Sequence, residues 1–150
     1  RRGFMERVEY YINIPSNCGM KAILLFADMD SLKVVNDKFG HKDGDFALKN
    51  IANILSQSFG PHDVIGRIGG DEFVCFAFID DSDYVTEVQR KIKDFSAELN
   101  ATCGKPYFIE MSVGVTEFVC DGEQTIEDLL SQADTALYSN KRYKRMSILK

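Results

Sequence analysis

The stretch Ala22-Ile23-Leu24-Leu25-Phe26-Ala27 is an uninterrupted apolar run, and it ends abruptly at Asp28-Met29-Asp30. Strands that are covered on both faces of a sheet have continuous apolar runs of this kind, whereas strands with one solvated face alternate. The run therefore predicts a central strand that is buried on both sides. Its acidic end places negative charge directly beside the predicted core.

Patterns on either side of this strand predict the remaining elements. Apolar residues that recur every three or four positions predict helices, and short apolar runs bounded by turn residues predict strands. The predicted helices cover residues 4–12, about 44–59, 85–99 and 126–137; the predicted strands cover 64–68, 73–79, 109–115 and, weakly, 147–149. A further helix is expected directly after the central strand. Gly69-Gly70-Asp71-Glu72 separates two of the strands and predicts the turn of a β-hairpin.

This order of elements predicts an α+β fold with a largely antiparallel central sheet flanked by helices. No glycine-rich phosphate loop follows the first strand, which argues against a doubly wound nucleotide-binding fold. The length of 150 residues fits one domain. With 45% hydrophobic and 27% charged residues, the chain is not of the disordered, collagenous or fibrous classes.

The net charge of −5 argues against broad, non-specific binding to nucleic acid or to an anionic membrane surface. A polyanionic ligand would have to be held by a metal ion or by a few well-placed cations. The chain has no signal-peptide pattern and no apolar run near the ~18–20 residues that cross a bilayer. It begins with Arg1, and we expect it to be a fragment of a longer protein. The cysteines lack metal-site spacing, which favours reduced thiols in a cytoplasmic setting.

Carboxylates occur at two places that folding alone does not explain. Asp28 and Asp30 end the central strand, and Asp71 and Glu72 lie at the predicted hairpin turn. One interpretation is structural: Asp30 or Ser31 caps the next helix, and the turn carboxylates are simply solvated. The other is that the two places converge, so that Asp28, Asp71 and Glu72 bind Mg²⁺, which prefers oxygen ligands and substrate phosphates. Like charges so close need a cation, and Gly69 and Gly70 would let a phosphate approach the backbone.

Five motifs together resemble those of GGDEF domains, the diguanylate cyclases, in order and over nearly the whole chain. Arg67-Ile68-Gly69-Gly70-Asp71-Glu72-Phe73 contains the sequence for which the family is named. Asp28 to Asp37 is similar to its D-x-D-x-F-K-x-x-N-D, and Gly40 to Asp45 to its G-H-x-x-G-D. Ser112-Val113-Gly114-Val115 resembles its S-[IV]-G-[VI] strand, and Ala133 to Lys141 its A-D-x-A-L-Y-x-A-K helix.

The resemblance implies a palm-like, nucleotidyl-cyclase-like fold with a ferredoxin-like core, and it implies roles for single residues. Asp28, the backbone carbonyl of Met29, Asp71 and Glu72 would bind Mg²⁺ or Mn²⁺; Asp71 or Glu72 would also assist catalysis, with the identity of the general base left open. Asn36 and Asp45 would recognise guanine, whose N1–H and N2–H₂ donors suit a carboxylate. The resemblance also implies that phosphates are bound by Lys33, Lys141 and Arg145. The substrate would further contact the turn at Gly69 and Gly70, and Leu32 in the pocket wall.

The chain departs from the family pattern at four places. The upstream D-x-L-T-G-L-x-N segment is missing, which suggests that it has been trimmed. Leu32 replaces the usual Phe in the pocket wall, and Tyr143-Lys144-Arg145-Met146 replaces the usual G-R-N ending around Arg145. The product-inhibition motif R-x-x-D becomes Gly60-Pro61-His62-Asp63, which lacks the arginine.

The function implied is a diguanylate cyclase that condenses two GTP molecules into cyclic di-GMP and releases two pyrophosphates. Each protomer of an antiparallel homodimer would hold one GTP. The alternative is a catalytically silent module for GTP binding or dimerisation within a multidomain signalling protein. We expect a cytoplasmic domain, or the cytoplasmic part of a membrane-anchored protein, that itself contacts neither membrane nor nucleic acid. Sensory domains and their signal would lie outside the fragment.

Overall fold

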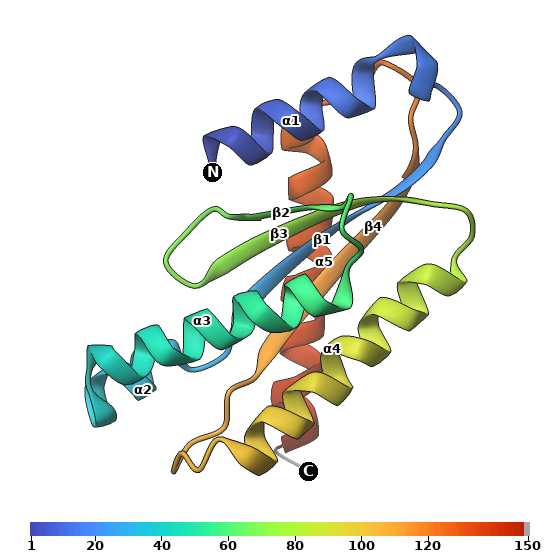
Figure 1. Cartoon of the computed structure of the whole chain (residues 1–150). Helices are drawn as coiled ribbons and strands as arrows, with labels where there is room; N and C mark the ends of the chain where they lie inside the picture. The colour runs from blue at the N-terminus through green and yellow to red at the C-terminus, as the bar shows by residue number, and fades with distance from the viewer. Residues whose placement is uncertain (149–150) are drawn as a thin grey trace.

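Strand β1 (Lys21–Met29) lies in the middle of the sheet in the computed structural model, which describes residues 1–148 (Figure 1). β3 (Glu72–Ile79) pairs with one side of it and β4 (Met111–Val119) with the other, both antiparallel. β2 (Val64–Arg67) pairs with β3, so the strand order is β2-β3-β1-β4. The predicted α+β fold with a central antiparallel sheet is therefore confirmed. The helices are α1 (Arg2–Asn13), α2 (Leu32–Phe39), α3 (His41–Ser58), α4 (Asp83–Thr102) and α5 (Ile126–Ile148), with a short 3-10 helix, η1 (Pro15–Asn17), before β1.

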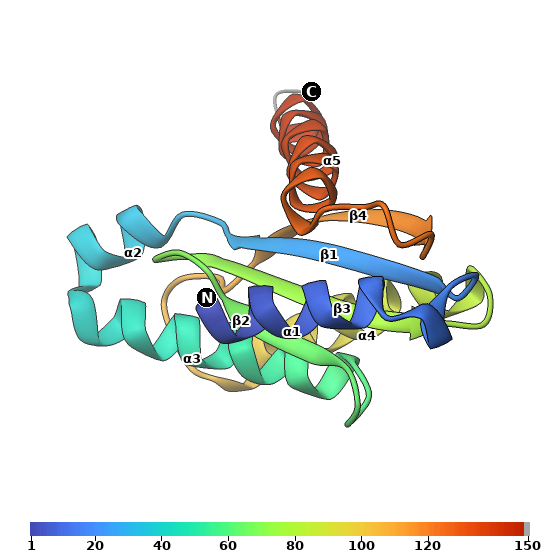
Figure 2. The ribbon, with the colours of Figure 1, turned by 90° about the horizontal axis from the view of Figure 1, so that it is seen from above.

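Helices cover both faces of the sheet, as the view in Figure 2 shows. Successive side chains of a strand point to opposite faces, so the two faces of β1 meet different helices. Leu24 and Phe26 pack with α1 and α5, whereas Ile23 and Leu25 pack with α3 and α4. All four side chains are buried, which explains why this strand is apolar at every position from Ala22 to Ala27.

Two predicted elements near the C-terminus differ from the structure. The predicted strand 109–115 begins only at Met111, because Ile109 is buried in the preceding loop, where its backbone bonds the Asn100 side chain. The predicted strand 147–149 is wrong: Ser147 and Ile148 continue α5, and residue 149 lies outside the described residues. α5 contains neither glycine nor proline, so its sequence holds no signal to end the helix earlier.

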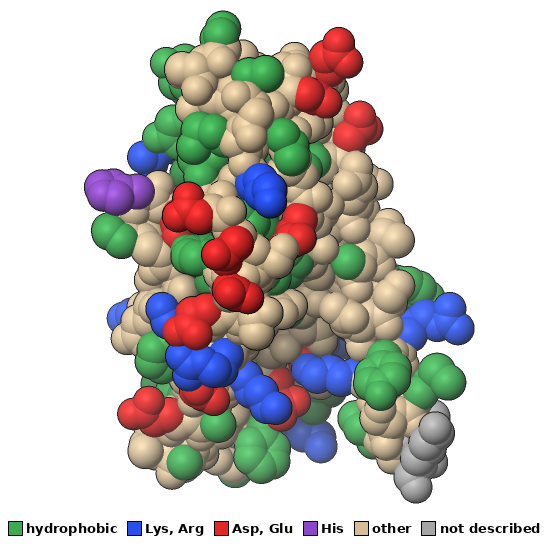
Figure 3. Space-filling model, turned by 90° about the vertical axis from the view of Figure 1, so that its right-hand side faces the viewer, with side chains coloured by type: hydrophobic (Ala, Val, Ile, Leu, Met, Phe, Trp, Pro, Cys, Tyr) green, Lys and Arg blue, Asp and Glu red, His purple; other side chains and the backbone are tan. Residues whose placement is uncertain are grey.

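The surface carries charge of both signs. Figure 3 views the side that is at the right in Figure 1, where acidic side chains gather midway along the face and basic ones lie directly below them. This face therefore offers no uniformly basic surface to a polyanion. Among residues 1–148, none of the helices has the length and apolar character needed to span a membrane.

Gly114 sets how closely α5 approaches the sheet. It pairs with Phe26 in the middle of β4. A Cβ atom at this position would lie 2.2 Å from the Ala133 carbonyl oxygen and 2.2 Å from the Leu137 amide nitrogen, both in the backbone of α5. The helix therefore rests directly on the strand, and only a residue without a side chain fits between them.

We expect Gly114→Ala to destabilise the protein by about 3 kcal/mol, at the upper end of the cost of overpacking a core, because backbone atoms cannot move aside as a side chain can. Urea unfolding followed by circular dichroism measures the change. Gly3→Ala is the matched control, because Gly3 is exposed in α1 and an added Cβ meets no atom within 4 Å. Equal stability of the two variants would contradict the close contact at Gly114.

Candidate active site

Three carboxylates come together where β1 ends. The antiparallel register places Asp28 opposite Glu72, and Asp71 precedes Glu72 in the hairpin turn. One oxygen from each of the three carboxylates lies within 4.8 Å of the other two. The backbone joins the same segments, because the Met29 amide donates to the Asp71 carbonyl at 3.0 Å. The convergence that the sequence suggested is thus present in the structure. Asp71 and Glu72 are partly open to solvent, whereas the Asp28 side chain is largely enclosed.

The hairpin turn is held by its own residues. The amides of Ile68 and Gly69 donate to the Glu72 carbonyl at 3.0 and 3.4 Å. Arg67 donates through Nε to the Gly69 carbonyl at 3.1 Å and through Nη2 to the Gly70 carbonyl at 2.5 Å. A Cβ atom at Gly69 would lie 2.5 Å from the Glu72 carboxylate, whereas one at Gly70 would meet no atom within 4 Å. Glu72 therefore covers Gly69, and the backbone at Gly70 remains accessible.

Helix α5 brings cations to the acidic end of β1. Lys141 Nζ bonds Asp28 Oδ2 at 2.6 Å, and Lys144 Nζ bonds Asp30 Oδ2 at 2.7 Å. Lys141, Lys144 and Arg145 line a hollow of about 230 Å³ together with Asp30 and Ser112. Sequence reasoning assigned Lys141 and Arg145 to this region and missed Lys144, which lies in the stretch that replaces the family's usual G-R-N ending. The one available signal was its spacing of three residues from Lys141, which places both on one side of a helix.

The interpretation of Asp30 or Ser31 as a side-chain cap for the next helix is wrong. Ser31 occupies the position before α2 with φ of 63° but makes no capping hydrogen bond through its side chain. The carboxylate of Asp30 points to β4 instead and accepts from the Ser112 hydroxyl at 2.9 Å. Asp30 therefore links β1 to β4 and to α5.

Asp28 is the most perturbed of the acidic groups. Burial raises the pKa of its carboxyl to about 6, the nearby Lys141 ammonium opposes that shift, and the Asp71 carboxylate adds to it. Its Oδ1 atom is buried and has no hydrogen-bond partner among residues 1–148. Buried polar atoms normally have partners. A buried, unpartnered oxygen on a carboxylate that is clustered with two more carboxylates fits a hard divalent cation, which takes oxygen ligands and offsets their mutual repulsion.

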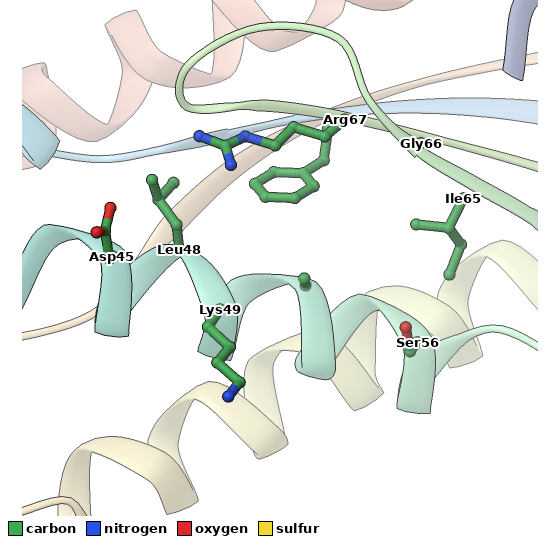
Figure 4. Close-up of a pocket in the computed structure, with 9 residues that line it drawn as sticks. Asp45, Leu48, Lys49, Ser56, Ile65, Gly66 and Arg67 are labelled. Atoms are coloured by element: carbon green, nitrogen blue, oxygen red, sulfur yellow. The ribbon is translucent and has the colours of Figure 1, made fainter. Parts of the chain in front are cut away.

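The residues expected to recognise the base lie on α2 and α3. Asp45 is exposed and lines a hollow of about 430 Å³ between α3 and the β2–β3 hairpin. Figure 4 shows Asp45 and Leu48 rising from α3 toward the hairpin, with Arg67 reaching over from β2. The Asn36 side chain packs against Gly44, the residue before Asp45, because a Cβ atom at Gly44 would lie 1.8 Å from Asn36 Oδ1.

The structure places the other expected substrate contacts, and the altered inhibition motif, outside the carboxylate cluster and the hollow that Asp45 lines. Leu32 is half-buried and packs against the core on the α3 side of the sheet, so only part of it can contribute to a pocket wall. Lys33 is exposed on α2. Asp63, the remaining acid of the altered inhibition motif, accepts from the Gly60 amide at 2.7 Å and from the Tyr84 hydroxyl at 2.5 Å. Its carboxylate thus stabilises a turn.

Comparisons with known proteins show which proteins the chain is similar to. The family model described as "Diguanylate cyclase, GGDEF domain" matches residues 1–147. The diguanylate cyclase DgcP of Escherichia coli K12 is 29% identical over 147 residues, which are 97% of this chain and 42% of that protein. The cyclic di-GMP phosphodiesterase NbdA of Pseudomonas aeruginosa is 30% identical over 136 residues, which are 89% of this chain and 17% of that protein. The chain thus spans less than half the length of these curated relatives.

A solved structure shares the fold. The diguanylate cyclase SiaD of Pseudomonas aeruginosa, solved in complex with its activator SiaC, superimposes with a TM-score of 0.83 at 30% sequence identity. The alignment covers 95% of this chain and 55% of that one.

The raised pKa of Asp28 predicts how stability depends on pH without metal. Between the ordinary value of 3.8 and about 6, the folded protein keeps a proton that the unfolded chain has lost, so stability falls as pH rises through this window. The shift corresponds to ~3 kcal/mol at most. We expect Asp28→Asn, which cannot ionise, to be more stable than the unsubstituted protein at pH 8 and to lose this advantage by pH 4.

Urea unfolding in EDTA at pH 4, 6 and 8 measures this difference. Exposed Asp37→Asn, on α2, controls for the removal of one carboxylate and should change stability by no more than ~0.5 kcal/mol. A less stable Asp28→Asn at pH 8 would show that the ion pair with Lys141 outweighs the cost of burying the charge.

Proposed function

The chain belongs to the GGDEF domain family of diguanylate cyclases, and we propose that it condenses two GTP molecules into cyclic di-GMP with release of two pyrophosphates. Each protomer of an antiparallel homodimer holds one GTP, so that each nucleotide faces the other. The observation that carries the proposal is the meeting of Asp28, Asp71 and Glu72 beside the cations of α5. Acidic metal ligands next to phosphate-binding cations are the arrangement that phosphoryl transfer requires.

Asp28, the Met29 carbonyl, Asp71 and Glu72 hold the metal ion in this proposal, with Mg²⁺ or Mn²⁺ as the ion. When bound, the ion supplies positive charge to the triphosphate and lowers the pKa of the attacking hydroxyl. Lys33, Lys141 and Arg145 bind phosphate oxygens, and the accessible backbone at Gly70, beside Gly69, admits a phosphate to the turn. The 3′-hydroxyl oxygen of one GTP forms a bond to the α-phosphorus of the other. The bond from that phosphorus to the bridging oxygen breaks, and pyrophosphate leaves.

The proton of the 3′-hydroxyl passes to Asp71 or Glu72, the two carboxylates at the hairpin turn, or through one of them to solvent. Both lie at the protomer surface, which leaves them open to a nucleotide held by the partner. Because each protomer contributes one nucleotide, catalysis depends on the meeting of two copies of the chain.

Recognition of guanine rests on Asp45 and Asn36. Guanine presents N1–H and N2–H₂ along one edge, and a carboxylate accepts two such donors. Adenine has an acceptor at N1, which would face the carboxylate of Asp45 without a proton between them. Leu48 and Phe73 provide apolar surface in the hollow that Asp45 lines. Leu32 contributes to the pocket wall in this proposal through the part of its side chain that the core leaves exposed.

The full protein is longer in this proposal, with sensory or other domains outside residues 1–150, and the GGDEF domain works in the cytoplasm. The less favoured proposal is a silent module that binds GTP or supports dimerisation for another domain. Incubation with GTP and Mg²⁺, followed by mass spectrometry of the products, separates the two.

We expect cyclic di-GMP to form, with specific activity that rises as protein concentration rises, because one chain supplies only half of each site. Asp71→Asn and Glu72→Gln should each lower the rate by at least ~100-fold, since even groups that only orient metal ligands are worth ten- to a hundredfold. Exposed Glu98→Gln on α4 is the charge-matched control. Binding of GTP without product would support the silent module, and constant specific activity over a wide dilution series would contradict the half-site arrangement.

We also expect weak product inhibition. The arginine of the family's inhibition motif is replaced by Gly60, and Asp63 is already bonded to the Gly60 amide and to Tyr84. Without the guanidinium, this surface lacks the group that grips guanine and phosphate together. Initial rates measured over a range of added cyclic di-GMP test this. Sub-micromolar inhibition that Asp63→Ala abolishes, and that Tyr84→Phe leaves intact, would refute the expectation.

A further inference from the structure

The helices that carry Asn36 and Asp45 form a corner whose two sides are anchored unequally, because α3 buries Gly44, Ala47 and Leu48 near its start whereas α2 buries very little. α2 has a single buried residue, Val35, and it turns into α3 at Gly40, whose φ is +94°. Asn36 and Gly44 pack directly against each other across this corner. The position of Asn36, and of the turn that joins α2 to α3, therefore depends in part on contacts made from outside the core.

The loop between α4 and β4 holds it through one carboxylate. Asp43, in the first turn of α3, accepts from Lys105 Nζ at 2.8 Å and from the Tyr107 hydroxyl at 2.7 Å. These two bonds lower the pKa of the Asp43 carboxyl, so it stays charged at neutral pH and both bonds are charge-assisted. Asp43 and Asp45 are two positions apart on a helix and so point in nearly opposite directions. Lys105 and Tyr107 can thus bind Asp43 on one side of α3 while Asp45 faces the hollow on the other side.

Aromatic contacts add to the two bonds. The ring of Tyr107 packs on Phe39, the last residue of α2, with ring centroids 5.0 Å apart. The Lys105 ammonium lies 4.8 Å from the centroid of Phe46, in the second turn of α3. The loop therefore contacts both α2 and α3 at the corner.

The far end of the loop is itself firmly attached. The Asn100 side chain bonds the backbone of Ile109 twice, donating to its carbonyl at 2.9 Å and accepting from its amide at 2.8 Å. Ile109 is fully buried in the core. Lys105 and Tyr107 are thus carried by a segment that is fixed to α4 and to the core.

We propose that Lys105 and Tyr107 are positioning residues for base recognition, which act through Asp43 to hold the α2–α3 corner in the geometry that accepts guanine. The proposal rests on the proposed function, because it assigns Asn36 and Asp45 to the base. Loosening the corner lowers the fraction of molecules that can accept the nucleotide, and the apparent affinity falls by that fraction. Bound substrate selects the ordered corner again, so the rate at saturation is largely preserved.

The test compares Tyr107→Phe with Tyr84→Phe. Each removes one tyrosine hydroxyl that donates to a carboxylate, but the Tyr84 bond to Asp63 lies away from the corner. We expect Tyr107→Phe to weaken binding of a GTP analogue with an α,β-methylene bridge, measured by calorimetry with Mg²⁺, by about three- to tenfold, as for a corner ordered a third to a tenth of the time. KM for GTP should rise similarly with kcat within about twofold, and Tyr84→Phe should change neither.

Two further readouts separate positioning from general destabilisation. Amide hydrogen exchange of residues 35–46 in the nucleotide-free protein should be faster in Tyr107→Phe and unchanged in Tyr84→Phe. Preference for GTP over inosine triphosphate, which lacks the 2-amino group, should fall in Tyr107→Phe. Asp43→Asn should also weaken binding of the analogue. In the Asp43→Asn background, Tyr107→Phe should reduce the affinity by a smaller factor than it does in the unsubstituted protein, because both substitutions remove the same contact.

The inference is overturned if Tyr107→Phe binds the analogue as tightly as Tyr84→Phe does, or if the exchange of residues 35–46 is the same in both. Failure of the proposed function gives a different result. An unsubstituted protein that binds the analogue but makes no cyclic di-GMP contradicts the cyclase and leaves the positioning role intact. If the unsubstituted protein does not bind the analogue, both the cyclase and the base-recognition role are contradicted. Hydrogen exchange then still measures whether the loop orders the corner.

Discussion

The pairing register of β1 with β3 is the constraint on which the rest of the site depends. It sets Asp28 opposite Glu72 and leaves Asp71 at the turn, so that three carboxylates share one small region. Their mutual repulsion and the burial of Asp28 both oppose this arrangement. The strand is held in place by apolar side chains on both faces of the sheet, and a shift of one residue would move every one of them to the wrong face. The packing of the core therefore holds the three carboxylates close together, although their repulsion would separate them in a hairpin that lacked this support.

Helix α5 connects this core to the acidic site. Its middle rests on the bare backbone of β4 at Gly114, and its last turns extend past the sheet with Lys141, Lys144 and Arg145. The buried face of α5, from Ile126 to Leu137, packs in the core over several turns, and this extended contact sets the direction of the turns that follow. The cations therefore arrive at Asp28 and Asp30, where they offset part of the negative charge.

Different parts of the fold are responsible for the two ends of the proposed substrate. The phosphate end depends on the sheet, the hairpin and α5, which are tied to the buried core. The base end depends on α2, which buries only Val35, and on the first turn of α3, and both are held by polar and aromatic contacts with the loop before β4. Substitutions in the first group should affect chemistry and stability together. Substitutions in the second should affect affinity and base preference, because a corner can loosen while the sheet stays intact.

The sequence by itself determined the central strand, the antiparallel α+β fold, the glycine hairpin and the candidate metal ligands, because apolar periodicity and carboxylates at strand ends are local signals. It also supported the family resemblance through motifs in order. Only the tertiary structure decided that Asp30 bonds Ser112 and Lys144 instead of capping a helix, and that residues 147–148 extend α5. Only the tertiary structure joined Asp43 to Tyr107, which are 64 positions apart. A contact between distant segments leaves no periodic trace in either of them, since it depends on how helices and strands pack and not on the pattern within one element.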